Sequence, residues 1–143
     1  MAGYSGTPLP QKLGIKAGAR VALVRAPEGF EKTLDPLPDG VSLRAQARGH
    51  HEVVVFFATR RAELERRFDA LSRAIVPAGG LWIAWPKRTA NVATDLSENH
   101  VREVGLAHGL VDNKVCAVDD VWSGLRFVYR VKDRPQKAKK KAR

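Results

Sequence analysis

The sequence predicts a three-layer α/β domain with a mostly parallel sheet and a C-terminal antiparallel hairpin. Runs rich in β-branched residues alternate with helix-like segments along most of the 143 residues, which is typical of a parallel sheet covered on both faces. The predicted strand 52–58 is apolar throughout after Glu52, as expected of a strand buried on both sides. The predicted strands 111–118 and 125–131 have no helix-length segment between them, so they should pair as a hairpin.

The first half of the chain is expected to contain an arm, three strands and one helix. Gly and Pro interrupt residues 1–19 so often that we expect an irregular arm there. Pro27 suits the first turn of a helix at 28–34. The three strands are predicted at 20–24, 41–46 and 52–58. Only 47–51 separates the last two, too few residues for a helical crossover, so the direction of the second strand stays open.

Two amphipathic helices and another strand are expected in the second half. Thr59 can cap the first helix, and Pro-Ala-Gly-Gly at 77–80 should end it before a strand at 81–85. Its apolar stripe consists of Leu64, Phe68, Leu71 and Ile75. The run 95–98 has capping-box spacing with Asp95 as the cap, so a second helix should open there and close at Gly109.

The net charge of +10 is concentrated at one end of the chain. Residues 130–143 contain eight Lys or Arg and one acid, which gives +7. We therefore predict an irregular arm at 1–19, an α/β domain at 20–131 and a basic disordered tail at 132–143. The tail lacks aromatic residues, so it supports at most weak, sequence-independent contact with nucleic acid.

Several classes of function find no support in the composition. A single cysteine, Cys116, can form neither an internal disulfide nor a cysteine-based zinc site, and we expect it to be a small buried hydrophobe. His50 and His51 should point to opposite faces, so they predict no metal site. No apolar leader or membrane-spanning run is present, which favours the cytoplasm and no membrane partner.

Two stretches resemble class I methyltransferases. Residues 14–24 are similar to the lead-in and first strand of that Rossmann-like fold, and residues 71–85 to a helix, a Pro-Gly turn and the next strand. The closing hairpin also fits. The resemblance implies a Rossmann-like, methyltransferase-type sheet.

At closer range the chain resembles a bacterial family known only as a domain of unknown function, which implies no activity. The shared motifs are Gly3-Tyr4-Ser5-Gly6-Thr7-Pro8-Leu9, Trp85-Pro86-Lys87, Val92-Ala93-Thr94-Asp95-Leu96, Gly109-Leu110-Val111-Asp112, and Val118-Asp119 with Trp122-Ser123-Gly124-Leu125.

The first loop departs from the methyltransferase pattern. In that family a glycine-rich turn lets the backbone approach the cofactor, and an acid ending the next strand holds the ribose. Here the turn 25–29 has only Gly29, and Pro27 removes a backbone donor. The second strand ends in Gln-Ala-Arg at 46–48, without an acid. The sequence thus disfavours the usual S-adenosylmethionine (SAM) site and leaves the cofactor unknown.

Basic residues follow several predicted strands at their carboxyl ends, where open α/β sheets bind ligands. Arg60 and Arg61 would lie in a first helical turn, where the helix dipole disfavours cations, and free amides near Thr94 and Asp95 could add to an anion site. The predicted ligand-binding residues are Arg25, Arg60, Arg61, Trp85, Lys87, Arg88, Thr94 and Asp95. The alternative is a set of solvated arginines paired with acids such as Glu63 and Glu65.

The sequence contains no combination of nucleophile, base and orienting residue, so no catalytic residue is predicted. The preferred expectation is a non-catalytic binding or regulatory protein that recognises an anionic small molecule or a protein partner. The first alternative is a methyltransferase-like enzyme with an atypical SAM site. The second alternative is a nucleic-acid-associated protein that acts through its tail.

Overall fold

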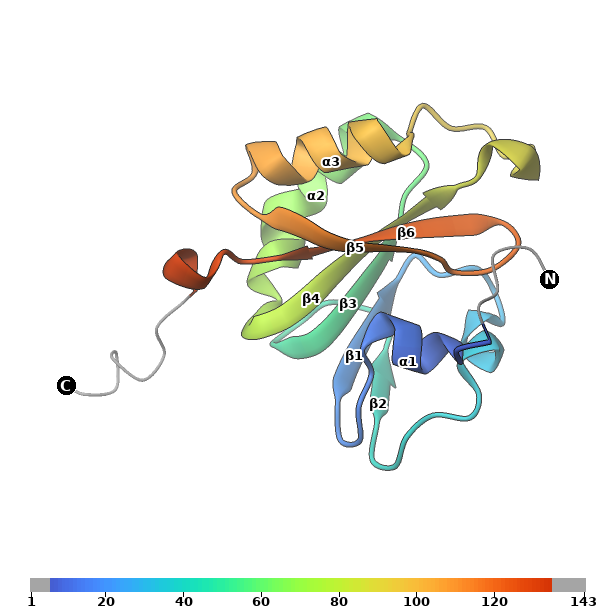
Figure 1. The fold of residues 1–143 in the computed structure, drawn as a ribbon, viewed down its shortest axis with the longest axis vertical. Coiled ribbons are helices and arrows are strands. Elements are labelled where there is room, and N and C mark those ends of the chain that lie inside the picture. The colour runs from blue at the N-terminus through green and yellow to red at the C-terminus, as the bar shows by residue number, and fades with distance from the viewer. Residues whose placement is uncertain (1–5, 135–143) are drawn as a thin grey trace.

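The computed structural model describes residues 6–134. Within this range a six-stranded sheet, in the order β2-β1-β3-β4-β6-β5, forms the middle layer (Figure 1). The strands are β1 (Arg20–Val24), β2 (Ser42–Arg44), β3 (His51–Phe57), β4 (Ile75–Pro86), β5 (Val111–Ala117) and β6 (Trp122–Val128). β1 to β4 pair in parallel, whereas β6 runs antiparallel to both β4 and β5. The predicted three-layer α/β fold with a closing hairpin is confirmed.

Helices cover the sheet on its two faces. The α-helices are α1 (Leu9–Leu13), α2 (Arg61–Arg73) and α3 (Glu98–Ala107), and the 3₁₀ helices are η1 (Phe30–Leu34), η2 (Arg88–Ala90) and η3 (Val131–Asp133). α2 and α3 lie together on one face, where they pack on residues such as Val54 and Phe56 of β3. α1 and η1 cover the opposite face, against Val53 and Val55 of the same strand (Figure 1). No helix in the described range is long and apolar enough to cross a bilayer.

The N-terminal arm, predicted to be irregular over residues 1–19, contains one short helix, α1. Pro10 lies in the first turn of α1, and Gly14 closes the helix in a left-handed conformation with φ of 81°. The same Gly and Pro residues that predicted an irregular arm therefore mark the ends of a short helix. Leu13 is fully buried, and its carbonyl accepts a 3.0 Å hydrogen bond from Trp82 Nε1 of β4. Residues 1–5 of the predicted arm lie outside the described residues.

The helix predicted at 28–34 is reduced to η1. Gly29 precedes it with φ of 79°, which no regular α-helix accommodates, so the helical segment begins only at Phe30. Phe30 and Leu34 are buried against the sheet and hold η1 in place.

The second strand is shorter than predicted and runs parallel to β1. Because β2 has only three residues, the chain needs to return by only about 10 Å along the strand direction, and to cross β1 by two strand spacings of about 4.8 Å each, to begin β3. The six residues 45–50 reach up to about 20 Å when extended, so they cross the sheet without a helix. Ala47 in this crossover packs against the core on the α2 side.

Residues 77–80 do not form the predicted turn. α2 ends at Arg73, and β4 begins at Ile75 and runs through all four of these residues. A side chain at Gly80 would overlap the guanidinium of Arg126 on β6. At Gly79 an added side chain would lie 2.8 Å from the Glu52 carbonyl oxygen of β3. Gly79 therefore allows a close approach between two strands, and the chain does not reverse here.

The hairpin and the C-terminal segment agree with the prediction in part. β5 and β6 pair antiparallel as expected, although β6 begins three residues earlier than predicted. Residues 132 and 133 of the predicted tail belong to η3, which begins at Val131. The expected disorder of 135–143 concerns residues outside the described range.

Candidate functional site

Two neighbouring parallel strands, β1 and β3, continue onto opposite faces of the sheet. The chain leaving β1 enters η1 on the α1 face, and the chain leaving β3 enters α2 on the other face (Figure 1). In open α/β sheets, ligands bind beside the carboxyl ends of the strands at such a point. The candidate site is therefore at the ends of β1, β2 and β3.

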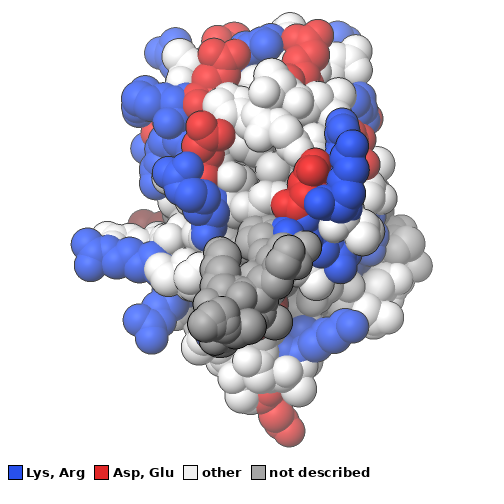
Figure 2. All heavy atoms as spheres, turned by 90° about the vertical axis from the view of Figure 1, so that its left-hand side faces the viewer, with Lys and Arg blue, Asp and Glu red and all other residues white. Residues whose placement is uncertain are grey.

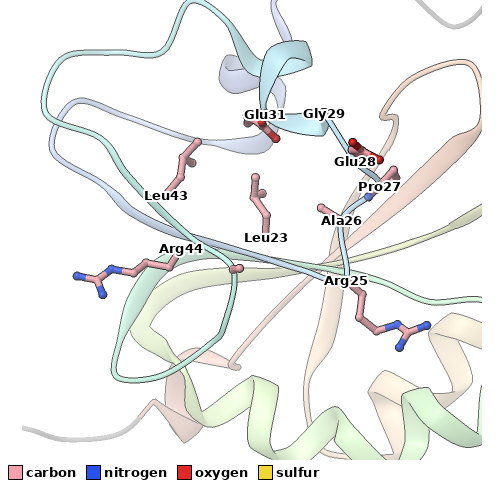
Figure 3. A pocket seen from close by; sticks show the side chains of 10 residues that line it. Leu23, Arg25, Ala26, Pro27, Glu28, Gly29, Glu31, Leu43 and Arg44 are labelled. Atoms are coloured by element: carbon pink, nitrogen blue, oxygen red, sulfur yellow. The ribbon is translucent and has the colours of Figure 1, made fainter.

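A cavity of about 470 Å³ lies at this edge, between the loop after β1 and the end of β2 (Figure 3). Its apolar side is formed by Leu23, Ala26 and Leu43. Glu28 and Glu31 lie on its opposite rim, in and just before η1. The cavity thus combines an apolar floor with two carboxylates.

The two arginines that border this cavity extend away from it. Figure 3 shows the Arg25 side chain running toward the α2 side and the Arg44 side chain running outward. Arg25 Nη1 lies 3.2 Å from Glu63 Oε2, in the first turn of α2. This ion pair spans the crevice between the ends of β1 and β3.

Arg25 also carries the unusual backbone conformation of the first loop. Its φ is 61°, in the left-handed region that side chains disfavour. The loop lacks the glycines of the methyltransferase pattern at this point, but its backbone bends as a glycine would allow. Such strain is found preferentially at functional sites.

The other predicted arginines do not reach the cavity. Arg61 forms ion pairs of 3.0 Å with Glu65 and Glu103, and hydrogen bonds to these carboxylates raise the pKa of its guanidinium. Arg60 is exposed and precedes α2 as its N-cap residue, and Arg88 is exposed in η2. The sequence left open that these arginines pair with acids such as Glu63 and Glu65. Arg25 and Arg61 do so, with Glu63 and Glu65 respectively.

Thr94 and Asp95 join two segments instead of opening a helix with free amides. The Asp95 carboxylate accepts a 2.8 Å hydrogen bond from the Arg61 amide, so it caps α2. Thr94 Oγ1 donates to the Thr59 carbonyl at 2.7 Å. The cap of α3 is Ser97, which accepts a hydrogen bond from the His100 amide. The predicted caps Thr59 and Asp95 are corrected accordingly: Asp95 serves α2, the helix before it.

Trp85 and Lys87 lie at the end of β4, where contacts within the fold hold them. Trp85 is buried in the core on the α2 and α3 side, and the Lys87 amide donates to the Val121 carbonyl at 2.8 Å. Of the eight predicted ligand-binding residues, only Arg25 lines the cavity.

Sequence reasoning missed Glu28, Glu31 and Leu43. Both acids stood in the segment predicted as a regular helix, and the short β2 hid the position of Leu43. The sequence did carry one sign of this site: Glu28 and Glu31 lie close to Gly29, directly after the first strand. η1 brings both carboxylates to the cavity.

The remaining candidates have structural roles. Asp119 accepts hydrogen bonds from the amides of Val121 and Trp122 and shapes the hairpin loop. Trp122 packs edge-to-face on Phe57, with ring centroids 5.1 Å apart. Cys116 is half-buried, and burial raises the pKa of its thiol. Among residues 6–134, no group of three or more His, Cys, Asp or Glu is placed to hold a metal ion.

Several solved structures with a similar fold are named as methyltransferases or contain bound SAH. A SAM-dependent methyltransferase from Aquifex aeolicus is 16% identical, with a TM-score of 0.59 and coverage of 82% of this chain and 85% of that one. The structure of a DhpI complex with S-adenosylhomocysteine (SAH) is 14% identical, with a TM-score of 0.57 and coverage of 86% of this chain and 83% of that one. Magnesium protoporphyrin IX methyltransferase from Synechocystis PCC 6803 with bound SAH is 10% identical, with a TM-score of 0.52 and coverage of 80% of this chain and 75% of that one. No family model matches the sequence, and no curated protein does.

These neighbours correct the preferred expectation. The sequence favoured a non-catalytic binding or regulatory protein for an anionic ligand or a protein partner. The similarity to solved structures of a SAM-dependent methyltransferase and of proteins with bound SAH overturns this preference. At these identities the comparison establishes the fold, and the chain has a Rossmann-like fold of the methyltransferase type.

Proposed function

We propose that this protein is a methyltransferase-type enzyme that holds SAM in an atypical site at the carboxyl ends of β1 and β2. The observation that carries the proposal is the cavity at this edge, with its apolar floor and its carboxylate rim. Its volume of about 470 Å³ lies in the range of about 300–1,000 Å³ typical of small-molecule sites.

The groups around the cavity fit the adenosine part of SAM. Leu23, Ala26 and Leu43 offer an apolar surface for the adenine ring. Glu28 and Glu31 are hydrogen-bond acceptors, which match the hydroxyl donors of a ribose. In the usual arrangement an acid at the end of the second strand has this role, and here the acids come from the other wall of the cavity.

The Arg25–Glu63 pair fits the amino-acid end of the same ligand. SAM carries an α-carboxylate and an α-ammonium, which complement a guanidinium and a carboxylate. Arg25 borders the cavity, and Glu63 pairs with it across the crevice between β1 and β3. The ligand would exchange their mutual ion pair for contacts of its own.

The charge of the rim supports a cationic ligand over an anionic one. When bound, SAM supplies an electrophilic methyl group on a positively charged sulfonium. Glu28 and Glu31 at the rim favour such a charge, whereas the nearby arginines extend away. The residues of this chain would bind and orient the ligand there.

Isothermal titration of the full chain with SAM and with SAH tests the proposal. We expect both ligands to bind, and saturation at about 100 times Kd should stabilise the fold by about 2.7 kcal/mol in thermal unfolding. Glu31→Gln and Glu28→Gln should each weaken binding by about tenfold, a typical loss of one hydrogen bond to a charged group. Asp133→Asn removes the same charge in η3, away from the cavity, and should leave binding unchanged.

The proposal fails if neither ligand binds at millimolar concentration. It also fails if Asp133→Asn weakens binding as much as the two rim variants, because the carboxylates would then act only through net charge.

Two finer expectations belong to this proposal. We propose that the protein is a member of the bacterial family of unknown function whose motifs it resembles, and that it acts in the cytoplasm. Trp85-Pro86-Lys87, one of those motifs, ends β4 at the same edge of the sheet as the cavity, which supports a shared site.

A further inference from the structure

The acidic side chains of α2 are engaged on the side of the helix that faces α3 or at its first turn. Glu65 binds Arg61, which also binds Glu103 of α3. Asp69 lies 2.7 Å from the ring of His108, directly after α3. The third acid, Glu63, pairs with Arg25.

Basic side chains occupy the solvent-exposed side of α2. Arg66 and Arg73 are seven positions apart and exposed, so they share a helical face, with the small residue Ala70 between them. Arg67 lies beside this face, with its guanidinium carbon 5.0 Å from the ring centre of the buried Phe56. This cation–π contact holds the guanidinium in place and leaves its N–H groups available.

The crossover after β2 adds further arginines next to α2. Arg48 and Arg67 line one hollow of about 310 Å³, together with Gln46, Ala47, Ala70 and Leu71. No carboxylate lines this hollow. Arg44, at the end of β2, continues the series to the border of the 470 Å³ cavity.

The C-terminal segment extends the series from the other end of α2. The hydroxyl of Tyr129 donates to the Ser72 carbonyl at 2.7 Å, which fastens the end of β6 beside the last turn of α2. Arg130, Lys132 and Arg134 follow and are exposed, with Asp133 as the acid among them. Figure 2 shows this end of the molecule, with Lys and Arg side chains gathered along its left-hand side.

We define the arginine track as Arg44, Arg48, Arg66, Arg67, Arg73, Arg130, Lys132 and Arg134. Among the described residues, none of these side chains forms an ion pair with an acid. Five more Lys or Arg, and no acid, follow in the sequence at 135–143.

We infer that the arginine track binds the sugar–phosphate backbone of a nucleic acid. A row of guanidinium groups matches a row of phosphates, each of which can accept paired hydrogen bonds. The track has no Phe, Trp or exposed base-stacking platform, so contact is with the backbone, and it is independent of sequence and sensitive to salt. Val131 is its one large exposed apolar side chain, too little to insert into a lipid surface. This inference does not depend on the proposed cofactor site.

Fluorescence anisotropy with the full chain tests the inference, using a labelled 20-nucleotide RNA and a labelled 20-base-pair DNA of mixed sequence, without SAM. We expect micromolar binding to at least one probe, in the range of about 10⁻⁴ to 10⁻⁶ M for non-specific contacts. The logarithm of affinity should fall linearly with the logarithm of salt concentration, by about 0.7 per phosphate contacted for the single strand.

Three variants separate the folded surface from the tail. The double variant R66Q/R73Q keeps the Arg67 contact with Phe56 and should weaken binding about tenfold, with the salt slope reduced by about 1.4 for RNA. The control K16Q/K32Q removes the same charge at exposed sites outside the track and should change affinity less than about threefold. The variant K137Q/K139Q/K140Q/K141Q/R143Q neutralises the tail, and its residual binding should still depend on Arg66 and Arg73.

The inference is overturned if R66Q/R73Q and its control lose equal affinity, or if neutralising the tail abolishes binding while R66Q/R73Q does not weaken it. Binding to vesicles with anionic lipid but to neither probe would assign the track to a membrane surface. Displacement of both probes by polyglutamate at equal charge would assign it to acidic proteins. Circular dichroism and thermal unfolding check that every variant is folded.

Discussion

Arg25 shows how one residue can keep the shape of a motif while its chemistry changes. The methyltransferase pattern places glycine after the first strand, and the absence of glycine predicted that the loop had lost this role. The backbone nevertheless adopts a left-handed conformation at Arg25, with φ of 61°. The side chain thus gained an ion pair with Glu63 at the cost of local strain, of order 1–3 kcal/mol for such positions.

Substitution of Arg25 can measure this strain. Arg25→Gly and Arg25→Ala both lose the pair with Glu63, but only glycine is free of the clash between Cβ and the following carbonyl. We expect Arg25→Gly to be more stable than Arg25→Ala by about 0.5–1 kcal/mol, after allowance for the larger unfolded-state entropy of glycine. Urea unfolding of the two variants measures the difference. Equal stability, or a more stable alanine variant, would show that the backbone is unstrained.

At the scale of elements, α2 and α3 are capped by two residues that are close in sequence, Asp95 and Ser97, and each of these residues caps a different helix. Asp95 binds the Arg61 amide of α2, and Ser97 binds the His100 amide of α3. The segment that leads into α3 therefore also fixes the start of α2, which carries Glu63 and the arginine track.

Alanine substitutions separate the two caps. Asp95→Ala and Ser97→Ala should each destabilise the protein by about 0.5–2 kcal/mol, the usual effect of a lost N-cap. Hydrogen exchange should speed up in the first turn of α2 for Asp95→Ala and in the first turn of α3 for Ser97→Ala. Faster exchange at α3 alone in both variants would return Asp95 to the role that the sequence predicted.

Elements defined by local pattern could be predicted, and those defined by distant contacts could not. The apolar run of β3 and the hairpin follow from short segments and their spacing. The role of Asp95 depends on a partner 34 positions away, at Arg61. Gly79 and Gly80 looked like a turn because their real reason, the close approach of β3 and Arg126, lies elsewhere in the chain.

At the scale of the whole molecule, the sheet needs covers on both faces, and α1 is one of them. Leu9, Leu13 and Ile15 are buried with residues of β1, β3 and β4. Together with η1, this segment closes the face on which the 470 Å³ cavity opens. The N-terminal segment is therefore part of the core that supports the candidate site.

Leu13→Ala tests this role of α1. A fully buried leucine should cost about 2–5 kcal/mol when truncated, whereas an irregular arm would tolerate the change. Gln11→Ala, on the exposed side of the same helix, serves as the control and should change stability by less than about 0.5 kcal/mol. Guanidinium unfolding compares the two. A Leu13→Ala variant as stable as the control would show that α1 is dispensable.

The position of the candidate site could be predicted, but most of its residues could not. The carboxyl edge of a parallel sheet follows from the order of strands and helices. Glu28 and Glu31 reach the cavity only because η1 replaces the expected helix, and Leu43 only because β2 is short. Arg61, one of the predicted basic residues, does not line the cavity and instead pairs with Glu65 and Glu103. The sequence pattern alone does not reveal these partners.

The crossover at 45–50 has a consequence for how the chain tolerates changes in length. It joins one wall of the cavity, at Arg44 and Ala45, to the start of β3 with few residues to spare. A deletion there would draw β2 out of register and move that wall, whereas an insertion would only loosen the link. Among natural variants of this chain, the segment should therefore lengthen freely and seldom shorten.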